Sequence, residues 1–130
     1  MKRYAWIAAV ALVVAGCGAR STNVVYTKTA TAACLEKQGV HVRSVADTSD
    51  FVAQSATGGA FRAGLPNNEV TVSFGLTVED ANNIDQAYRR FRAKNVGIND
   101  VLRSQGSAVM LWHVHPTDAD IATITGCLKS

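Results

Sequence analysis

Hydrophobic and polar residues alternate in several short segments of the chain, and this period of two predicts strands. The clearest segment is Glu69–Gly75, where the pattern is that of a strand with one buried and one solvated face. Val40–Val45 shows a shorter alternation. Ala108–His115 is hydrophobic at both parities for most of its length, which predicts a central strand, and Ala60–Leu65 is a candidate edge strand.

Three other segments carry the pattern of an amphipathic helix, with hydrophobic residues at intervals of three and four. Thr29–Gln38 is rich in alanine and ends before Gly39, a residue suited to a helix C-terminus. A second helix is expected after Thr77, whose hydroxyl suits an N-cap. Thr117–Leu128 starts with a capping-box pattern. The predicted apolar stripe of the second helix consists of Ala81, Ile84, Tyr88 and Phe91.

This order of elements predicts an α+β domain. Three amphipathic helices and three or four mostly antiparallel strands are too few to close a barrel, so we expect a two-layer sandwich with the helices on one face of a small sheet. The arrangement resembles a ferredoxin-like or permuted split βαβ fold. Residues 46–66 have no clear period apart from the candidate strand, and their structure is left open.

The N-terminus has the composition of an export signal. Lys2 and Arg3 precede an uncharged, mainly hydrophobic run over residues 4–16. As a helix this run would be about 20 Å long, whereas the hydrocarbon core of a bilayer needs about 30 Å. The run is therefore too short for a comfortable transmembrane helix and predicts a secretory signal.

The end of this run, Val14–Cys17 (VAGC), resembles the lipobox of bacterial lipoprotein precursors. The resemblance covers residues 1–17 only. It implies that the leader is removed, that Cys17 carries a diacylglycerol, and that the new amino group is usually acylated, so that several acyl chains hold the protein at a membrane. Ordinary secretion with cleavage before Arg20, and an uncleaved anchor, are the alternatives.

The lipobox interpretation also fixes the expected organisation and location of the chain. It gives a signal peptide (1–16), a lipidated cysteine with a polar tether (17–28) and a single domain (29–130). The domain would lie outside the cytoplasm, on the outer face of the cell membrane or on the outer membrane of a bacterium.

The charge of the mature chain argues against one class of partner. Without Lys2 and Arg3, the 13 basic side chains become 11, against 10 acidic ones. A nucleic-acid-binding domain normally shows a surplus of lysine and arginine. We therefore expect no nucleic-acid partner.

Two cysteines, Cys34 and Cys127, remain near opposite ends of the domain if Cys17 is lipidated. Disulfides form and persist outside the cytoplasm, so we expect these two residues to pair. Such a disulfide would close a loop of about 90 residues. In the chain-entropy description this stabilises the folded state by roughly 4–5 kcal/mol. Two buried free thiols are the alternative. Metal binding has less support, because neither cysteine belongs to a C-x-x-C pair.

The histidines form the one pattern with metal-binding chemistry. His113 and His115 are two residues apart, which places both imidazoles on one side of a strand, and imidazole is a good zinc ligand. A complete site would need His41 or a carboxylate from a neighbouring strand. In the simpler interpretation both histidines end in solvent, while Asp118 and Asp120 stabilise the first turn of the last helix.

We therefore expect a small binding or interaction module without a cofactor and without catalytic residues, because the chain has no nucleophile motif and no carboxylate pair that the sequence forces together. Its partners would be the membrane, through the lipid on Cys17, and a protein or small molecule. A metal carrier or metal-dependent enzyme built on His113 and His115, and a structural envelope component, are the alternatives. The expected contact surface is the exposed sheet face with Thr71, Ser73, Arg43, His41 and His113.

Overall fold

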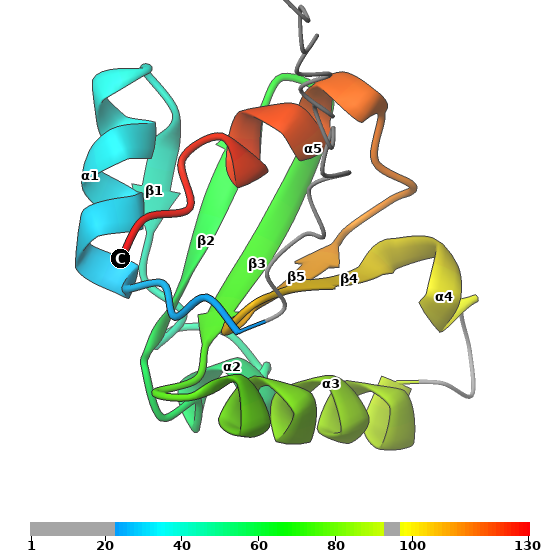
Figure 1. Ribbon diagram of the computed structural model, residues 1–130. Coiled ribbons are helices and arrows are strands. Elements are labelled where there is room, and N and C mark those ends of the chain that lie inside the picture. The colour runs from blue at the N-terminus through cyan, green and yellow to red at the C-terminus, as the bar shows by residue number, and fades with distance from the viewer. Residues whose placement is uncertain (1–22, 93–96) are drawn as a thin grey trace, which may run out of the picture.

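A computed structural model describes residues 23–92 and 97–130, which form a five-stranded sheet and five helices (Figure 1). The sheet order is β1-β2-β3-β5-β4, and every neighbouring pair is antiparallel. In chain order the elements are α1 (Lys28–Lys37), β1 (His41–Arg43), α2 (Phe51–Gln54), β2 (Ala60–Leu65), β3 (Asn68–Phe74), α3 (Val78–Arg92), α4 (Ile98–Val101), β4 (Leu102–Gln105), β5 (Ala108–Trp112) and α5 (Asp118–Thr125).

The connections between the strands show how the sheet is assembled. β1, β2 and β3 follow one another in the chain and are neighbours in the sheet. β4 and β5 form a hairpin at the opposite edge. The chain leaves β3, forms α3 and α4, and returns as β4 beyond the position of β5. β5 therefore pairs with both β3 and β4, which run parallel to each other on its two sides.

The predicted α+β class is confirmed, but the predicted number of elements is too small. Among the described residues, five strands and five helices replace the expected three or four strands and three helices. β3, α3 and β4 form a split βαβ unit, because β5 lies between the two parallel strands that the helical crossover connects. The missed strand, β4, has four residues and directly follows the short helix α4, so it leaves no period of its own in the sequence.

Two other strands differ from expectation in place or length. Ala60–Leu65 lies between β1 and β3 rather than at an edge. The strand expected over Ala108–His115 ends at Trp112. His113 and Val114 form a bend that is still bonded to Glu69 and Asn68, and the chain then leads into α5, so the strand does not continue through both histidines.

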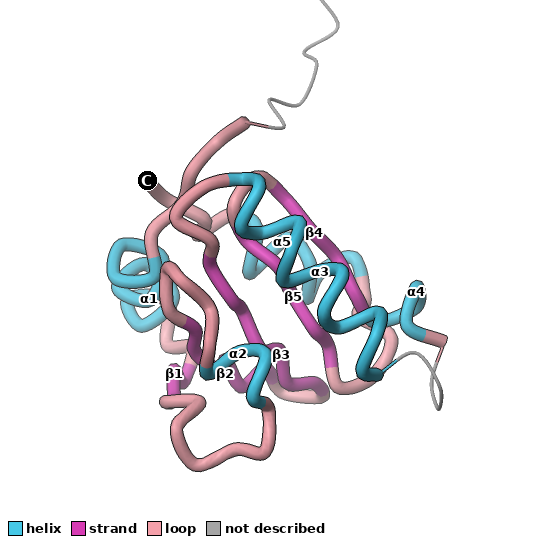
Figure 2. Tube along the Cα trace, turned by 90° about the horizontal axis from the view of Figure 1, so that it is seen from below, coloured by secondary structure: helices cyan, strands magenta, loops and turns pink. Residues whose placement is uncertain are grey.

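Helices cover both faces of the sheet rather than one. Val72 and Ser73 are successive residues of β3, point to opposite faces and are both fully buried. Ser104 of β4 shares the face of Ser73, and its hydroxyl donates to Asp85 of α3 at 2.7 Å. Figure 2 shows α3 in front of β4 and β5, with α5 behind them. The prediction that the helices cover only one face of the sheet is wrong. Successive residues of β5 point to opposite faces and are hydrophobic, so both faces need a covering layer.

The local signals of the helices are largely confirmed. The Thr77 hydroxyl accepts from the Asp80 amide at 3.1 Å, as expected of an N-cap for α3. Thr117 and Asp120 form the predicted capping box of α5. The stripe of α3 packs in the core except at its last position, since the side chain of Phe91 is 58% exposed.

The segment before α1 belongs to the folded domain. The Ser107 amide donates to the Val24 carbonyl at 2.9 Å, and the Tyr26 amide donates to the Ser107 hydroxyl at 2.7 Å. The Thr27 amide donates to the Lys129 carbonyl at 2.7 Å. Residues 24–27, which the sequence assigns to the tether, are thus held between the β4–β5 turn and the C-terminal segment.

Gly106 in the β4–β5 turn is required both by its backbone angle and by this contact. Its φ is +53°, and a Cβ there would lie 2.2 Å from the Val24 carbonyl oxygen. We expect Gly106→Ala to lower the free energy of unfolding by roughly 1–3 kcal/mol in denaturant titrations. Gly39→Ala is the matched control, because Gly39 also has a positive φ, of +81°, but has nothing within 4 Å of such a Cβ. Equal losses for both variants would show that the close approach to Val24 contributes nothing.

Candidate functional site

On the face of the sheet that carries α2 and α3, a hollow of about 160 Å³ lies between the segment before α2 and the strands. The register brings its floor together: Arg62 of β2 is opposite Thr71 of β3, and Thr71 is opposite Leu111 of β5. One row further, the His113 amide donates to the Glu69 carbonyl at 2.8 Å. The lining residues are Thr48, Ser49, Asp50, Arg62, Glu69, Thr71, Leu111, Trp112 and His113.

The wall of the hollow is held in place by Asp50. One carboxylate oxygen, Oδ1, accepts from the Ala53 amide at 3.0 Å and so caps α2. The other, Oδ2, accepts from the buried hydroxyl of Tyr88 on α3 at 2.9 Å. The loop is further closed by Gln54, whose side-chain amide donates to the Thr48 carbonyl at 2.6 Å. A residue of the core helix α3 therefore fixes the position of the loop that covers the sheet.

Charged side chains of opposite sign meet on the floor. Glu69 lies between two arginines and forms an ion pair with Arg43 and a longer one, at 3.9 Å, with Arg62. Arg62 also donates from Nε to the Ser44 carbonyl at 3.3 Å. Partly exposed ion pairs of this kind stabilise a fold by only about 0–1 kcal/mol. The floor thus offers both hydrogen-bond donors and acceptors to a partner. If these side chains exchange their present ion pairs for bonds to the partner, the fold loses little stability.

The three histidines do not converge. His113 lines the hollow, whereas Nδ1 of His115 lies 2.6 Å from Oδ1 of Asp100 at the surface. His41 is on the edge strand β1, opposite Gly64. In residues 23–92 and 97–130, no group of three or more His, Cys, Asp or Glu side chains is placed to hold a metal ion.

The residues of the predicted contact surface differ in their exposure. His41, Arg43 and His113 are exposed and Thr71 is half-buried, but Ser73 is fully buried. The prediction for Ser73 is wrong because α3 covers that end of the face, as the contact of Asp85 with the β4 strand shows.

The sequence prediction missed Arg62, Glu69 and Asp50 as site residues. Glu69 shares the parity of Thr71 on β3, so the alternation of that strand carried the signal for it. The contributions of Arg62 and Asp50 depend on strand pairing and on the fold of the loop, and the local sequence carries no signal for them.

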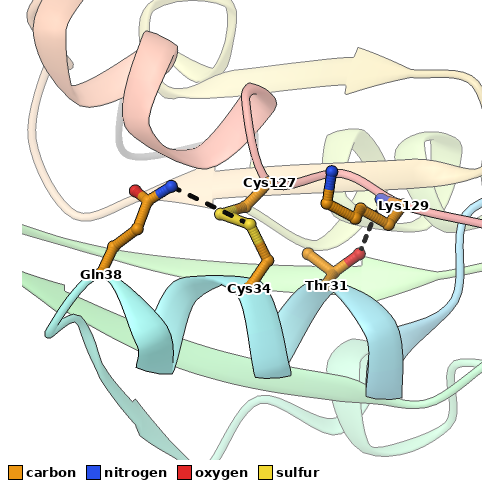
Figure 3. The surroundings of a disulfide bond; sticks show 5 residues. All are labelled: Thr31, Cys34, Gln38, Cys127 and Lys129. Carbon is orange, nitrogen blue, oxygen red and sulfur yellow. Dashed lines mark hydrogen bonds between the residues drawn. A yellow bond between two sulfur atoms is a disulfide. The ribbon is translucent and has the colours of Figure 1, made fainter.

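The structure brings Cys34 and Cys127 together as a disulfide between α1 and the segment that follows α5, with their Cα atoms 5.4 Å apart (Figure 3). Cys127 is fully buried. Next to the disulfide, the Lys129 amide donates to the Thr31 hydroxyl at 3.2 Å. The disulfide thus ties the C-terminal segment to α1, on the side of the sheet opposite α3.

The predicted signal peptide and Cys17 lie outside the described residues. Within the part of the chain that the structure describes, no helix has both the length and the hydrophobicity needed to cross a membrane.

The chain matches no known protein family, no curated protein and no solved structure. Its function is therefore argued from the residues and their arrangement.

Proposed function

We propose that this chain is a lipid-anchored extracytoplasmic domain that binds a polar partner on the open part of its sheet. The observation that carries the proposal is the hollow between the Asp50 loop and the strands, whose floor is made of Arg62, Glu69, Thr71 and His113. Arg62, Glu69 and Thr71 sit on paired strands, and the His113 amide is bonded to the Glu69 carbonyl, so the spacing of these side chains is fixed before a partner arrives. A preformed polar surface of this kind reduces the ordering cost of binding.

The size of the hollow favours a macromolecular partner. Sites that enclose a small molecule are usually about 300–1,000 Å³, and this hollow is smaller, at about 160 Å³. It accommodates one polar group, such as a side chain, while the surrounding exposed residues His41 and Arg43 extend the contact area. A protein or peptide that inserts a polar side chain next to Glu69 and Arg62 fits this geometry.

Binding is favoured over catalysis by the way the carboxylates are used. Asp50 is engaged by the Ala53 amide and the Tyr88 hydroxyl. Glu69 is engaged by Arg43 and Arg62. A general acid or base needs a carboxyl group that is available to exchange protons with a substrate, and both of these have structural hydrogen-bond or ion-pair partners.

The proposed location is supported by the lipobox resemblance and by the disulfide. Val14–Cys17 provides the attachment point in the sequence. The Cys34–Cys127 disulfide of the structure is of a kind that persists in oxidising surroundings outside the cytoplasm. Export followed by anchoring explains both features with one pathway.

Site-specific photo-cross-linking in cells that make the protein tests the binding function. A photoreactive amino acid at His41 or His113, both exposed on the proposed surface, is expected to give a discrete cross-linked product. The same amino acid at Ala122, which is exposed on α5 beyond the opposite face of the sheet, is the matched control. Adding Arg62→Gln should remove the product. Equal products from all three positions, or none from the two sheet positions, would contradict the proposal.

A further inference from the structure

The exposed hydrophobic side chains of the domain are not scattered. In the described residues, the large hydrophobic side chains that are exposed are Val25, Phe51, Leu76, Phe91 and Val114, with exposed fractions between 41% and 66%. Four of them line two grooves, one between α2 and α3 and one beside the N-terminal segment. We call these four, Val25, Leu76, Phe51 and Phe91, the apolar strip.

The first groove, of about 280 Å³, runs between α2 and α3. At one end Phe51 and Phe91 meet edge to face, with their ring centres 5.1 Å apart. Both rings remain more than half exposed. The apolar pattern of α3 predicts a buried Phe91, so the structure leaves outside the core a side chain that the helix period would place within it.

The second groove, of about 220 Å³, lies beside the N-terminal segment and is lined by Val25, Leu76 and Gly58 among others. It joins the first at Thr57, which lines the α2–α3 groove and is followed directly by Gly58. The Leu76 amide donates to the Thr57 hydroxyl at 3.2 Å, which holds this junction together. The two grooves, and with them the two halves of the apolar strip, therefore adjoin at the Thr57–Gly58 segment.

The strip begins where the chain enters the domain from the proposed anchor. Val24, next to Val25, is held at the β4–β5 turn by the hydrogen bond that its carbonyl accepts from the Ser107 amide. Six residues from Cys17 to 22 precede Asn23, and even a fully extended chain of six residues spans only about 20 Å. Helix α3, with 15 residues, is about 22 Å long at 1.5 Å per residue. The tether thus holds Val25, where the strip begins, within about 20 Å of a bilayer that carries the lipid, a distance comparable to the length of α3.

We propose that the apolar strip rests on the phospholipid bilayer that holds the lipid of Cys17. This inference rests on the lipid anchor of the proposed function. Aromatic and aliphatic side chains on an exposed helical face insert at the level of the lipid headgroups, about 5–10 Å into the interface. Docking along α2 and α3 would restrict how the domain turns on its short tether and would set the direction in which the binding face is presented.

The charges beside the strip are compatible with a lipid surface. Lys28 lines the groove at the Leu76 end. Arg90 is exposed and follows Ala87, a residue of the α2–α3 groove, by three positions. The one carboxylate in that groove, Asp80, accepts from the Thr57 hydroxyl at 3.0 Å. Basic side chains at both ends of an apolar contact favour anionic headgroups.

Fluorescence quenching by lipids brominated on their acyl chains tests this contact in the lipid-modified chain. A tryptophan replaces an exposed side chain on the strip, as Phe91→Trp, or on the other side of the sheet, as the matched control Ala122→Trp. The native Trp112 is 2% exposed, so the unsubstituted chain provides the background. In vesicles of brominated phosphatidylcholine and phosphatidylglycerol, Phe91→Trp is expected to lose most of its added emission, and Ala122→Trp to keep it.

The outcomes separate this inference from the anchor on which it rests. Flotation of each protein with the vesicles is measured first, and failure to float would overturn the lipid anchor itself. If the proteins float but the two tryptophans are quenched equally, or Ala122→Trp more strongly, the docking of the strip is overturned while the anchor stands. A third outcome would also overturn the docking of the strip. If the tryptophan of Phe91→Trp is shielded from water but not quenched by bromine, and the shielding grows with the number of chains per vesicle, a second copy of the chain covers the strip.

Discussion

Replacing both Cys34 and Cys127 by alanine is expected to lower the free energy of unfolding by roughly 2–5 kcal/mol. The disulfide joins residues 93 positions apart. In the chain-entropy description, a loop of that length is worth about 4–5 kcal/mol, because the cross-link restricts the unfolded chain. A domain of this size has a total stability of about 5–15 kcal/mol, so the loss would be a large part of it. Urea titration without reductant measures the difference.

Reduction of the natural protein provides the matched control for this variant. A reductant should lower the stability of the natural protein to that of the double alanine variant and leave the variant itself unchanged. A loss below about 1 kcal/mol would mean that neighbouring hydrogen bonds, such as that from Lys129 to Thr31, hold α1 and the C-terminal segment together unaided. A large loss would mean that the fold depends on oxidising surroundings, in keeping with the proposed location.

Asp50→Ala is expected to lower the free energy of unfolding by roughly 2–4 kcal/mol. This is the largest effect that we expect from a single substitution at the proposed site. It removes the cap of α2, typically worth about 1 kcal/mol, and the bond from the Tyr88 hydroxyl to a charged acceptor, worth about 1.5–3 kcal/mol. The residue is only 7% exposed, so solvent replaces these bonds poorly. Denaturant unfolding measures the loss, and the same variant should weaken cross-linking from His113 because the loop would no longer be held over the strands.

Two further variants separate the roles of Asp50. Tyr88→Phe removes the bond to α3 and keeps the cap, whereas Asp50→Asn keeps an acceptor for the Ala53 amide and removes the charge. In a double-mutant cycle, Asp50→Ala and Tyr88→Phe should be non-additive, because they share one hydrogen bond. A cost for Asp50→Ala below about 0.5 kcal/mol, as at ordinary surface positions, would show that the carboxylate does not hold the loop.

The parts of the fold that could be predicted are those that a short stretch of sequence specifies. The alternation of Glu69–Gly75 predicted β3 to within a residue at each end. The capping residues Thr77 and Thr117 marked the starts of α3 and α5 because an N-cap bonds to amides only a few residues away. The expectation that Cys34 and Cys127 pair followed from the cysteine count and the lipobox, before any geometry was known.

The candidate site could be predicted only in outline. The polar parity of β3 pointed to Thr71, and the alternation around His41 pointed to the same face. The same reasoning included Ser73, which α3 buries, and omitted Arg62, which strand pairing brings next to Glu69. A period of two shows that the sides of a strand differ, but it does not show which neighbour covers each side.

By itself, the sequence determined the local elements and their caps, because each depends on residues close together in the chain. It also supplied two cysteines suited to pairing. The tertiary structure decided the order of the five strands, the helices on both faces, the exposure of Phe91 and the hollow closed by the Asp50–Tyr88 bond. These features depend on contacts between residues tens of positions apart, and such contacts leave no periodic trace in the segments that make them.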